Sequence, residues 1–466
     1  MQKKSRQRRA PPFTKIIFMK NGQIANQNNT LMEKIVSLCK RRGFVFPGSE
    51  IYGGLQGFYD YGPLGSEVKN NLKQLWWRWM TREHDDIVGI DGAIITHPKV
   101  WEASGHVKNF VDPLSECKKC HHRFKTDDLK GNDCPDCGGK LTEPRNYNIL
   151  VPTELGVIEG EKTKAYLRGE ACQNIYLNFK NVLQSSRLQI PFGICQIGKA
   201  FRNEVTPGNF LYRQREFEQW DLQWFINPKE ADKWFEFWKR ERMNWYKGLF
   251  THPENLGFYQ HEKLAHYAKK AFDIEYLKSP FTGKEIEGIH WRGDWDLSRH
   301  GEYSGQDLSY IDPITGEKFV PWIIETSGGV DRTFLFLMID AYTEEKDRIV
   351  LKLNPRIAPY QAAVFPLLAN KSELVKKARE VFEMLKLDFS VAWDDRGNIG
   401  KRYYSQDETG TITSATVDFQ TIEDNTVTLR DRDTKTQIRL SIPELRGAIQ
   451  SIIDGEEFSK LGKVIG

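Results

Sequence analysis

The stretch from Gly198 to Phe225 constrains the fold more than any other part of this chain. It reads GKAFRNEVTPGNFLYRQREFEQWDLQWF. Apolar residues at its two ends predict two β-strands, and Pro207, Gly208 and Asn209 predict a chain-reversing loop between them. We therefore expect an antiparallel pair of strands joined by a long loop.

The charged side chains of this pair are expected to face a single site. Arg202 and Glu204 are two residues apart, so they point to the same side of the first strand. Phe217 and Asp221 are four apart, which also places them on one face of the return strand. A guanidinium, carboxylates and a ring suit a nucleotide, because arginine clamps phosphate and a ring stacks on a base. A salt-bridged amphipathic hairpin without a ligand fits the pattern as well.

FRNE, the loop and RQREF together resemble motif 2 of the class II aminoacyl-tRNA synthetases. The longer string FRNEVTPGNFLYRQREFEQWD resembles one branch of that class, the dimeric glycyl-tRNA synthetases, and similarity to this branch covers nearly everything from Met32 onward. The resemblance implies ATP-dependent activation of glycine and its transfer to the terminal adenosine of tRNA(Gly). Three other functions stay open: another class II synthetase, a non-catalytic synthetase paralogue, and a zinc-ribbon nucleic-acid-binding protein.

Length and composition agree with a large multidomain protein. With 466 residues, two or three domains are expected. The net charge of +4 permits nucleic-acid binding without proving it. No apolar run approaches the ~20 residues that cross a bilayer, so we expect a cytoplasmic protein with no membrane contact. Four of the seven cysteines form two tight pairs, which indicates a metal site in a reducing compartment rather than disulfides.

The expected fold class is α+β. The resemblance implies a class II catalytic domain at residues 32–357, built on an antiparallel β-sheet with helices. A zinc-ribbon insertion is expected at about 115–142 and a helical insertion at about 228–275. Alternating strand and helix patterns after residue 357 predict an α/β domain at 358–466, which resembles the anticodon-binding domain of this class. Within it, Ser441 and Glu444 form a capping box, and Lys401 and Arg402 are candidate RNA contacts.

Residues 1–31 carry seven Lys or Arg and no acid. We expect them to be a disordered extension without a catalytic role. A transit-like segment, an RNA-binding arm and a misread start upstream of Met32 are alternatives.

The helix predicted from a Ser66 cap carries apolar residues at 3.6-residue spacing, and the strand that follows is expected to end at Pro98. This pair resembles motif 1, which implies that it forms the interface of a homodimer. An ordinary amphipathic helix would show the same spacing.

Two CxxC pairs, Cys117/Cys120 and Cys134/Cys137, form a zinc-ribbon pattern. Each turn lets two thiolates reach one tetrahedral ion, and four thiolates close the site, so we expect structural Zn²⁺.

Residues 319–342 resemble motif 3, a buried strand that enters a Gly-Gly turn and an apolar helix. Arg332 lies in the first turn of that helix, where the helix N-terminus favours phosphate. By resemblance, Arg202 and Arg332 are the catalytic residues, Glu204 binds the adenine amino group, Phe217 stacks on adenine, and Mg²⁺ bridges the phosphates.

The resemblance implies two residue sets. The ATP set is Arg202, Asn203, Glu204, Tyr212, Arg213, Gln214, Arg215, Glu216, Phe217, Glu285, Ile286, Gly329, Val330, Asp331 and Arg332. The glycine set is Glu170, Phe217, Glu218, Gln219, Trp220, Asp221, Arg292, Glu325, Thr326, Ser327, Gly328 and Gly329. Within the glycine set, the resemblance implies that Glu170, Asp221 and Glu325 face the ammonium group of glycine. Ser327 is then placed against its α-hydrogens, and Arg292 against its carboxylate.

This chain departs from the family pattern at five positions near these sets. They are Gly169, Cys172, Asp221, His290 and Trp291, where the family usually has Pro, Thr, Glu, Ala and Asp.

Overall fold

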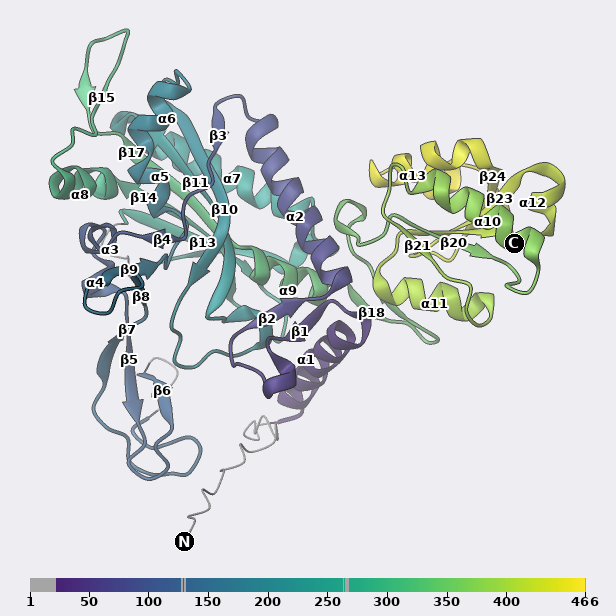
Figure 1. Ribbon diagram of the computed structural model, residues 1–466, viewed down its shortest axis with the longest axis horizontal. Helices are drawn as coiled ribbons and strands as arrows, with labels where there is room; N and C mark the ends of the chain where they lie inside the picture. Colours follow the sequence, from purple (N-terminus) through teal and green to yellow (C-terminus); the bar gives the residue numbers. More distant parts are fainter. Residues whose placement is uncertain (1–21, 127–128, 130, 263, 265–267, 466) are drawn as a thin grey trace.

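The computed structural model describes residues 22–126, 129, 131–262, 264 and 268–465. They form a large N-terminal body and a smaller C-terminal unit that lie side by side (Figure 1). Most of the expected extension lies outside the described residues. Helix α1, however, spans Gly22–Arg42, so it includes residues that were expected to be disordered.

A seven-stranded sheet forms the centre of the N-terminal body. Its order is β12-β13-β14-β17-β11-β10-β3, and every pair is antiparallel except β10 and β3. The strands are β3 Ile87–Gly89, β10 Phe192–Phe201, β11 Glu216–Ile226, β12 Leu256–Gln260, β13 Lys270–Tyr276, β14 Lys284–Gly293 and β17 Trp322–Gly329.

The antiparallel pair β10 and β11 confirms the strands expected from the central stretch. Its register places Gln196 opposite Asp221, and β17 places Ser327 on the other side of Asp221. Strand β10 ends at Phe201, however, so Arg202 and Glu204 follow the strand and are not part of it.

Helices pack their apolar faces on this sheet. The helices of the body are α2 Pro63–Arg82, α3 Pro98–Ala103, α4 His106–Asn109, α5 Gln173–Leu177, α6 Phe179–Ser185, α7 Ala231–Lys247, α8 Trp295–Ser304 and α9 Val330–Ala341. Most of the apolar stripe predicted for α2 is buried, and Trp76 stacks on Trp220 of β11 with ring centroids 5.6 Å apart. Helix α9 is buried almost all round and fixes the end of β17.

Two details of the motif 1 region were predicted wrongly. Helix α2 begins at Pro63 after Gly62 and has no cap at Ser66, because proline is well suited to the first position of a helix. The expected strand is divided into β3 and β4 (Ile95–Thr96), and Pro98 begins α3.

The predicted helical insertion at 228–275 is helical only at its start. Helix α7 is followed by β12 and β13, which extend the main sheet. Arg242 interrupts the apolar stripe of α7 in the sequence, yet it is fully buried and donates to Glu287 of β14 at 2.5 and 2.9 Å. The paired charge is what allows this arginine inside the core.

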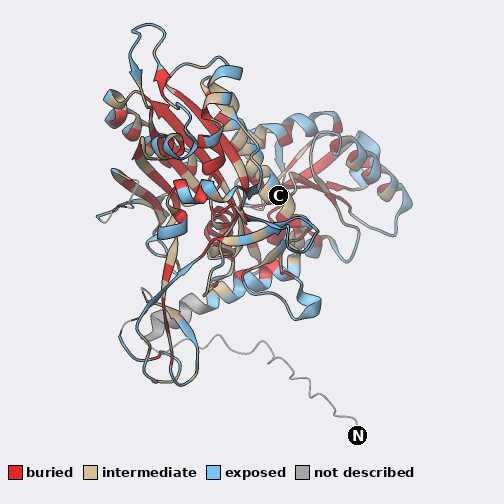
Figure 2. Cartoon of the chain, turned by 60° about the vertical axis from the view of Figure 1, so that its left-hand side comes forward, coloured by how far each residue is buried: buried red, intermediate tan, exposed pale blue. Residues whose placement is uncertain are grey.

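Smaller sheets surround the body. The ribbon sheet has the order β6-β5-β7, with β5 Val111–Glu116, β6 Arg123–Lys125 and β7 Arg145–Asn148. It projects from the body in Figure 1, and its surface is largely exposed in Figure 2. The others are β1 Val45–Pro47 with β2 Tyr59–Tyr61, β4 with β9 Thr163–Leu167 and β8 Val151–Leu155, β15 Tyr310–Ile311 with β16 Lys318–Phe319, and β18 Tyr342–Glu344 with β19 Ile349–Leu351.

The C-terminal unit is the expected α/β fold with its own apolar core. Its sheet order is β21-β20-β22-β23-β24-β25, with strands Val391–Trp393, Ala362–Pro366, Thr413–Val417, Thr426–Asp431, Gln437–Ser441 and Lys463–Ile465 in that order. Its helices are α10 Ser372–Leu385, α11 Ile399–Thr409, α12 Phe419–Asp424 and α13 Leu445–Ile453. The capping box of Ser441 and Glu444 is confirmed.

Arg402 does not suit the RNA contact expected of it. It is buried on α11, and its guanidinium donates to the carbonyl groups of Arg396, Asp395 and Gly397 and to that of Pro366. Its role is therefore to hold the loop before α11. None of the described helices is long and apolar enough to cross a membrane.

Candidate active site

A cavity of about 460 Å³ lies over one end of the main sheet. Strands β11, β14 and β17 form its floor, and the N-terminus of α9, the loop 168–172 and the start of β5 form its walls. This volume is in the range of small-ligand sites. Most of the predicted residues line it: Glu170, Arg202, Glu204, Tyr212, Arg213, Gln214, Phe217, Glu218, Gln219, Asp221, Glu285, Glu325, Ser327, Gly328, Gly329, Asp331 and Arg332.

Three carboxylates converge at one end of the cavity, as the resemblance implied. They are Glu170 from the loop after β9, Asp221 from β11 and Glu325 from β17. The Cys172 Sγ atom and oxygens of Asp221 and Glu325 all lie within 4.8 Å of one another. Cys172 therefore occupies space in the middle of the acid group.

Asp221 differs from the other two acids because it forms no ion pair within the part of the chain that the structure describes. It is 1% exposed, and its Oδ2 atom has no hydrogen-bond partner among the described residues. Burial raises the pKa of Asp221 well above its usual range, and the charge of Glu325 raises it further. An unpaired buried oxygen costs free energy, so this atom is suited to a donor supplied by a ligand.

Glu325, by contrast, is held by several donors. Arg292 Nη1 lies 2.9 Å away, His290 Nδ1 2.8 Å and Gln223 Nε2 3.0 Å. Burial alone would raise the pKa of Glu325, but the Arg292 charge and the His290 contact hold it below its usual range. Glu325 is thus ionised and fixed in place.

Arg292 was predicted to contact a substrate carboxylate, and it is not among the residues that line the cavity. It is buried, and its guanidinium binds Asp296 at 2.8 and 3.1 Å as well as Glu325. Arg292 lies at the end of β14 and Asp296 in the first turn of α8, so the turn from strand to helix brings the two side chains together. Arg292 therefore neutralises and orients Glu325.

The predicted nucleotide end is formed by Arg202, Phe217, Arg332 and Glu285. The Arg202 guanidinium lies between two rings, 5.0 Å from the centroid of Phe110 and 5.2 Å from that of Phe217. Arg332 lies 4.5 Å from the ring centroid of Tyr212, and its Nη1 is 3.1 Å from Glu285 Oε2. Two guanidinium groups therefore face one cavity with aromatic rings beside them, as phosphate and base binding require.

Two lysines connect helix α2 with this cavity. Lys69 Nζ lies 2.6 Å from Asp331 and 3.1 Å from Glu218, and Lys73 Nζ lies 2.7 Å from Glu218. Asp331 also accepts from the Tyr61 hydroxyl at 2.5 Å and from the Glu218 N–H at 2.6 Å. The network fixes the first turn of α9, which carries Arg332.

Other predicted residues lie outside the cavity and support it. Trp220 donates to Glu287 at 3.0 Å and presses on Gly328, where a Cβ atom would lie 2.4 Å from Trp220 Nε1. Arg215 donates to the carbonyl of Glu204 at 2.8 Å. The remaining residues of this kind are Asn203, Glu216, Ile286, Thr326 and Val330.

The sequence did not predict the wall of the cavity that is formed by the ribbon sheet and by the residues just before it. Phe110, Asp112 and Lys125 line the cavity, and Lys125 Nζ lies 2.5 Å from Asp112. His106, just before them, lies 3.0 Å from Glu170. No spacing pattern connects these positions with the motifs, so only the fold brings them together.

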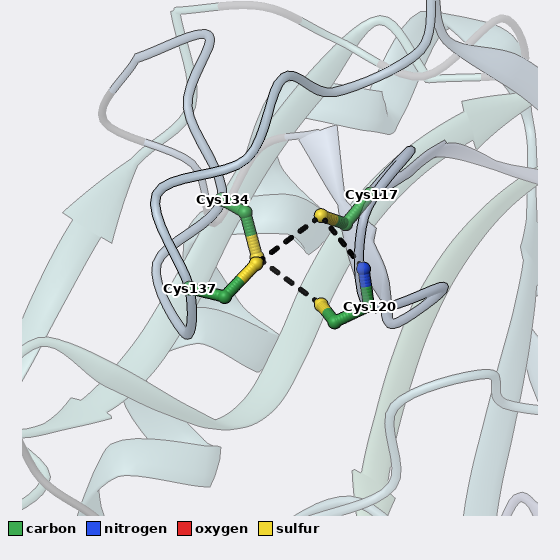
Figure 3. A group of neighbouring side chains, drawn as sticks. All are labelled: Cys117, Cys120, Cys134 and Cys137. Atoms are coloured by element: carbon green, nitrogen blue, oxygen red, sulfur yellow. Dashed lines mark hydrogen bonds between the residues drawn. The ribbon is translucent and has the colours of Figure 1, made fainter.

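The four predicted zinc ligands are gathered at the tip of the ribbon. Figure 3 shows the thiols of Cys117 and Cys120 facing those of Cys134 and Cys137. The sulfurs of Cys117 and Cys137 are 3.5 Å apart, and those of Cys120 and Cys134 are 3.7 Å apart. Sulfurs bound to one tetrahedral zinc at about 2.3 Å would be about 3.8 Å apart. Backbone N–H groups of Cys120 and Lys119 point at Cys117 Sγ and lower the pKa of Cys117 to about 6, which favours the thiolate that a metal needs.

Comparisons with known proteins agree with this geometry. Residues 156–342 match the family model "tRNA synthetase class II core domain (G, H, P, S and T)", and residues 361–452 match "Anticodon binding domain". The glycine–tRNA ligase of Treponema denticola is 51% identical over 439 residues, which cover 91% of this chain and 97% of that protein. That of Borreliella burgdorferi is 49% identical over 445 residues (92% and 99%), and that of Thermobifida fusca is 48% identical over 446 residues (89% and 96%).

Proposed function

The chain belongs to the glycine–tRNA ligases, with a class II core and an anticodon-binding domain, and from this we propose how its cavity activates glycine. The activity is the ligation of glycine to tRNA, which includes activation of glycine with ATP. Of the alternatives weighed on sequence, the non-catalytic paralogue does not fit, because Arg202, Glu204, Phe217 and Arg332 all line the cavity.

The unpaired Asp221 oxygen supports the glycine site most directly. An ammonium group placed between Glu170, Asp221 and Glu325 would give Asp221 Oδ2 the donor that it lacks. Glycine has no side chain, so selectivity requires that larger side chains be excluded. Cys172 fills space among the acids, and Gly328 is pinned by Trp220 behind them.

The ATP site follows from the two arginines. Activation brings a carboxylate to the α-phosphate, and these two anions repel each other. Arg202, beside Glu170, is placed to neutralise the substrate carboxylate and the α-phosphate. Adenine would stack on Phe217, and Arg332 would contact either the other face of adenine or the γ-phosphate. Mg²⁺ arrives with ATP and shields the phosphate oxygens. The attacking carboxylate is already ionised, so no general base is needed.

We expect Arg202→Ala and Arg332→Ala each to lower glycine-dependent ATP–pyrophosphate exchange by a factor of roughly 100–1000, because losing a preorganised charge costs about 3–4 kcal/mol. Exchange is measured with glycine, alanine and serine, and only glycine should support it efficiently. Arg240→Ala, an exposed arginine of α7, is the control and should exchange as the unchanged protein does. Near-normal exchange by either cavity variant would show that its role is assigned wrongly, and efficient use of alanine would contradict the proposed pocket.

A further inference from the structure

His106 is a buried histidine that the proposed reaction does not yet use. It begins α4 and is 4% exposed. Its ring packs edge-on against Trp101 and Phe110, with centroids 5.1 and 5.0 Å away. The side chain is thus confined among aromatic rings just before the start of the ribbon sheet.

Both ring nitrogens of His106 have partners. Nδ1 lies 2.8 Å from the hydroxyl of Ser104, and Nε2 lies 3.0 Å from Glu170 Oε2. An ionised carboxylate can only accept, so Nε2 carries the proton and donates it to Glu170. The Asn148 side chain holds the backbone carbonyl of His106 at 3.0 Å. The imidazole is therefore fixed and aimed at one oxygen of Glu170.

The other oxygen of Glu170 faces a competitor. Arg202 Nη2 lies 3.6 Å from Glu170 Oε1, and Arg202 Nε donates to the neighbouring carbonyl of Gly169 at 3.1 Å. A closer Glu170–Arg202 pair would occupy the acid that faces the ammonium group and the arginine that faces the phosphate.

We propose that His106 is a positioning residue, which holds Glu170 toward the glycine pocket and prevents it from pairing fully with Arg202. This inference rests on the proposed contact between Glu170 and the glycine ammonium group. It gives the segment that precedes the ribbon sheet an indirect part in glycine binding through Glu170, because His106 and the cavity-lining Phe110 are on this same short segment.

Two substitutions separate hydrogen bonding from packing. His106→Gln keeps a donor at about the position of Nε2 but loses the ring, and His106→Phe keeps a ring against Trp101 and Phe110 but loses the donor. We expect His106→Phe to raise the KM for glycine roughly tenfold or more, since a hydrogen bond to a charged group is lost. His106→Gln should stay close to the unchanged protein, and the KM for ATP should change little in both.

A packing role predicts the opposite order, so equal losses, or a smaller loss in His106→Phe than in His106→Gln, would overturn the proposal. Ser104→Ala frees Nδ1 without changing the ring and should raise the KM for glycine by a smaller factor, which keeps the test valid if His106→Phe does not fold. The control is His252→Phe, an exposed histidine that also pairs with a glutamate, and it should leave both constants unchanged.

Glu170→Gln distinguishes this inference from the proposed site. If Glu170→Gln leaves the KM for glycine unchanged, the proposed site itself is wrong. If Glu170→Gln raises it and His106→Phe does not, only the positioning role of His106 fails.

Discussion

At the scale of single residues, Asp221 links the stability of the folded protein to pH. Its carboxyl is buried beside Glu325 with one unpaired oxygen, and its pKa is raised. The folded, empty protein therefore binds this proton more tightly than the unfolded chain does. It follows that the free energy of unfolding of the empty protein decreases as pH rises from the ordinary pKa of aspartate toward the raised one.

We expect Asp221→Asn to have opposite effects on stability and binding. Asparagine cannot ionise, so the melting temperature of the variant should rise relative to that of the wild-type protein as pH increases. The KM for glycine should rise roughly tenfold or more, because a charged partner of the ammonium group is lost. Thermal unfolding over a pH series and pyrophosphate exchange measure the two effects. Asp454→Asn, at an exposed position, is the control, and a stability difference independent of pH would contradict the raised pKa.

The sequence predicted most single residues of the cavity because they lie within motifs. Glu170, Asp221 and Glu325 come from three separate stretches, and the fold brings all three together. The pairing of Arg292 with Asp296 and Glu325 was not predicted, since it depends on how β14 enters α8. His106 was missed because nothing in its local sequence marks it as a partner of Glu170.

At the scale of elements, the ribbon connects a metal site with the cavity. Strand β5 carries Asp112 at the cavity and is followed directly by Cys117 at the tip. The spacing of the cysteines was sufficient to predict the cluster, since two CxxC turns have few other uses. The contact of β5 with the cavity was not predictable, because it depends on where the insertion leaves the body.

We expect one zinc ion per chain, bound through the four thiolates. Protein purified without added zinc should contain it, and Cys120→Ser should lose most of it, because a tetrahedral site with three thiolates is incomplete. Metal analysis measures the content. His122→Ala is the matched control, since His122 lies beside the cluster and pairs with Asp136. Zinc lost in His122→Ala, or retained fully in Cys120→Ser, would show that the ligands are assigned wrongly.

Strand β12 and strand β13 show why one element type was predicted wrongly. Residues 256–260 and 270–276 are rich in aromatic and branched side chains, which suit a strand, but they follow a strongly helical stretch. Antiparallel pairing decides the matter: β13 pairs with β12 before it and with β14, which begins eight positions after β13 ends. These are local pairings, so the helical character of the preceding stretch was extended too far along the chain.

At the scale of the whole molecule, the two units were predictable and their junction was not. Glu408 of α11 accepts from Arg42 Nε at 2.6 Å and from Arg41 at 2.5 Å, although more than 360 positions separate them. Asp407, next to it, binds Arg348 at 2.6 Å and Arg430 at 2.9 Å. Helix α1 thus joins the body to the C-terminal unit, through charges that the sequence places far apart.

The predicted homodimer rests on the segment that leads to Pro98, and less on α2 than the sequence indicated. The tryptophans of α2 pack within their own subunit, and its outward positions Asn70, Gln74 and Arg78 are polar. Strand β4, by contrast, is the edge of its sheet, and Ile94 and Ile95 are 37% and 46% exposed. An exposed strand edge with two isoleucines is suited to pair with a second copy.

We expect sedimentation at micromolar concentration to show a dimer, and the double substitution Ile94→Asp with Ile95→Asp to shift it toward monomer. Burial of one isoleucine contributes about 1.5–3 kcal/mol, and a two-fold interface repeats the change, so dissociation should increase by several factors of ten. Both side chains are exposed within one chain, so the fold should tolerate the charges. Ile314→Asp, 89% exposed on the loop between β15 and β16, is the control and should remain dimeric. A monomer before any substitution, or a dimer that the double variant leaves intact, would remove this edge from the interface.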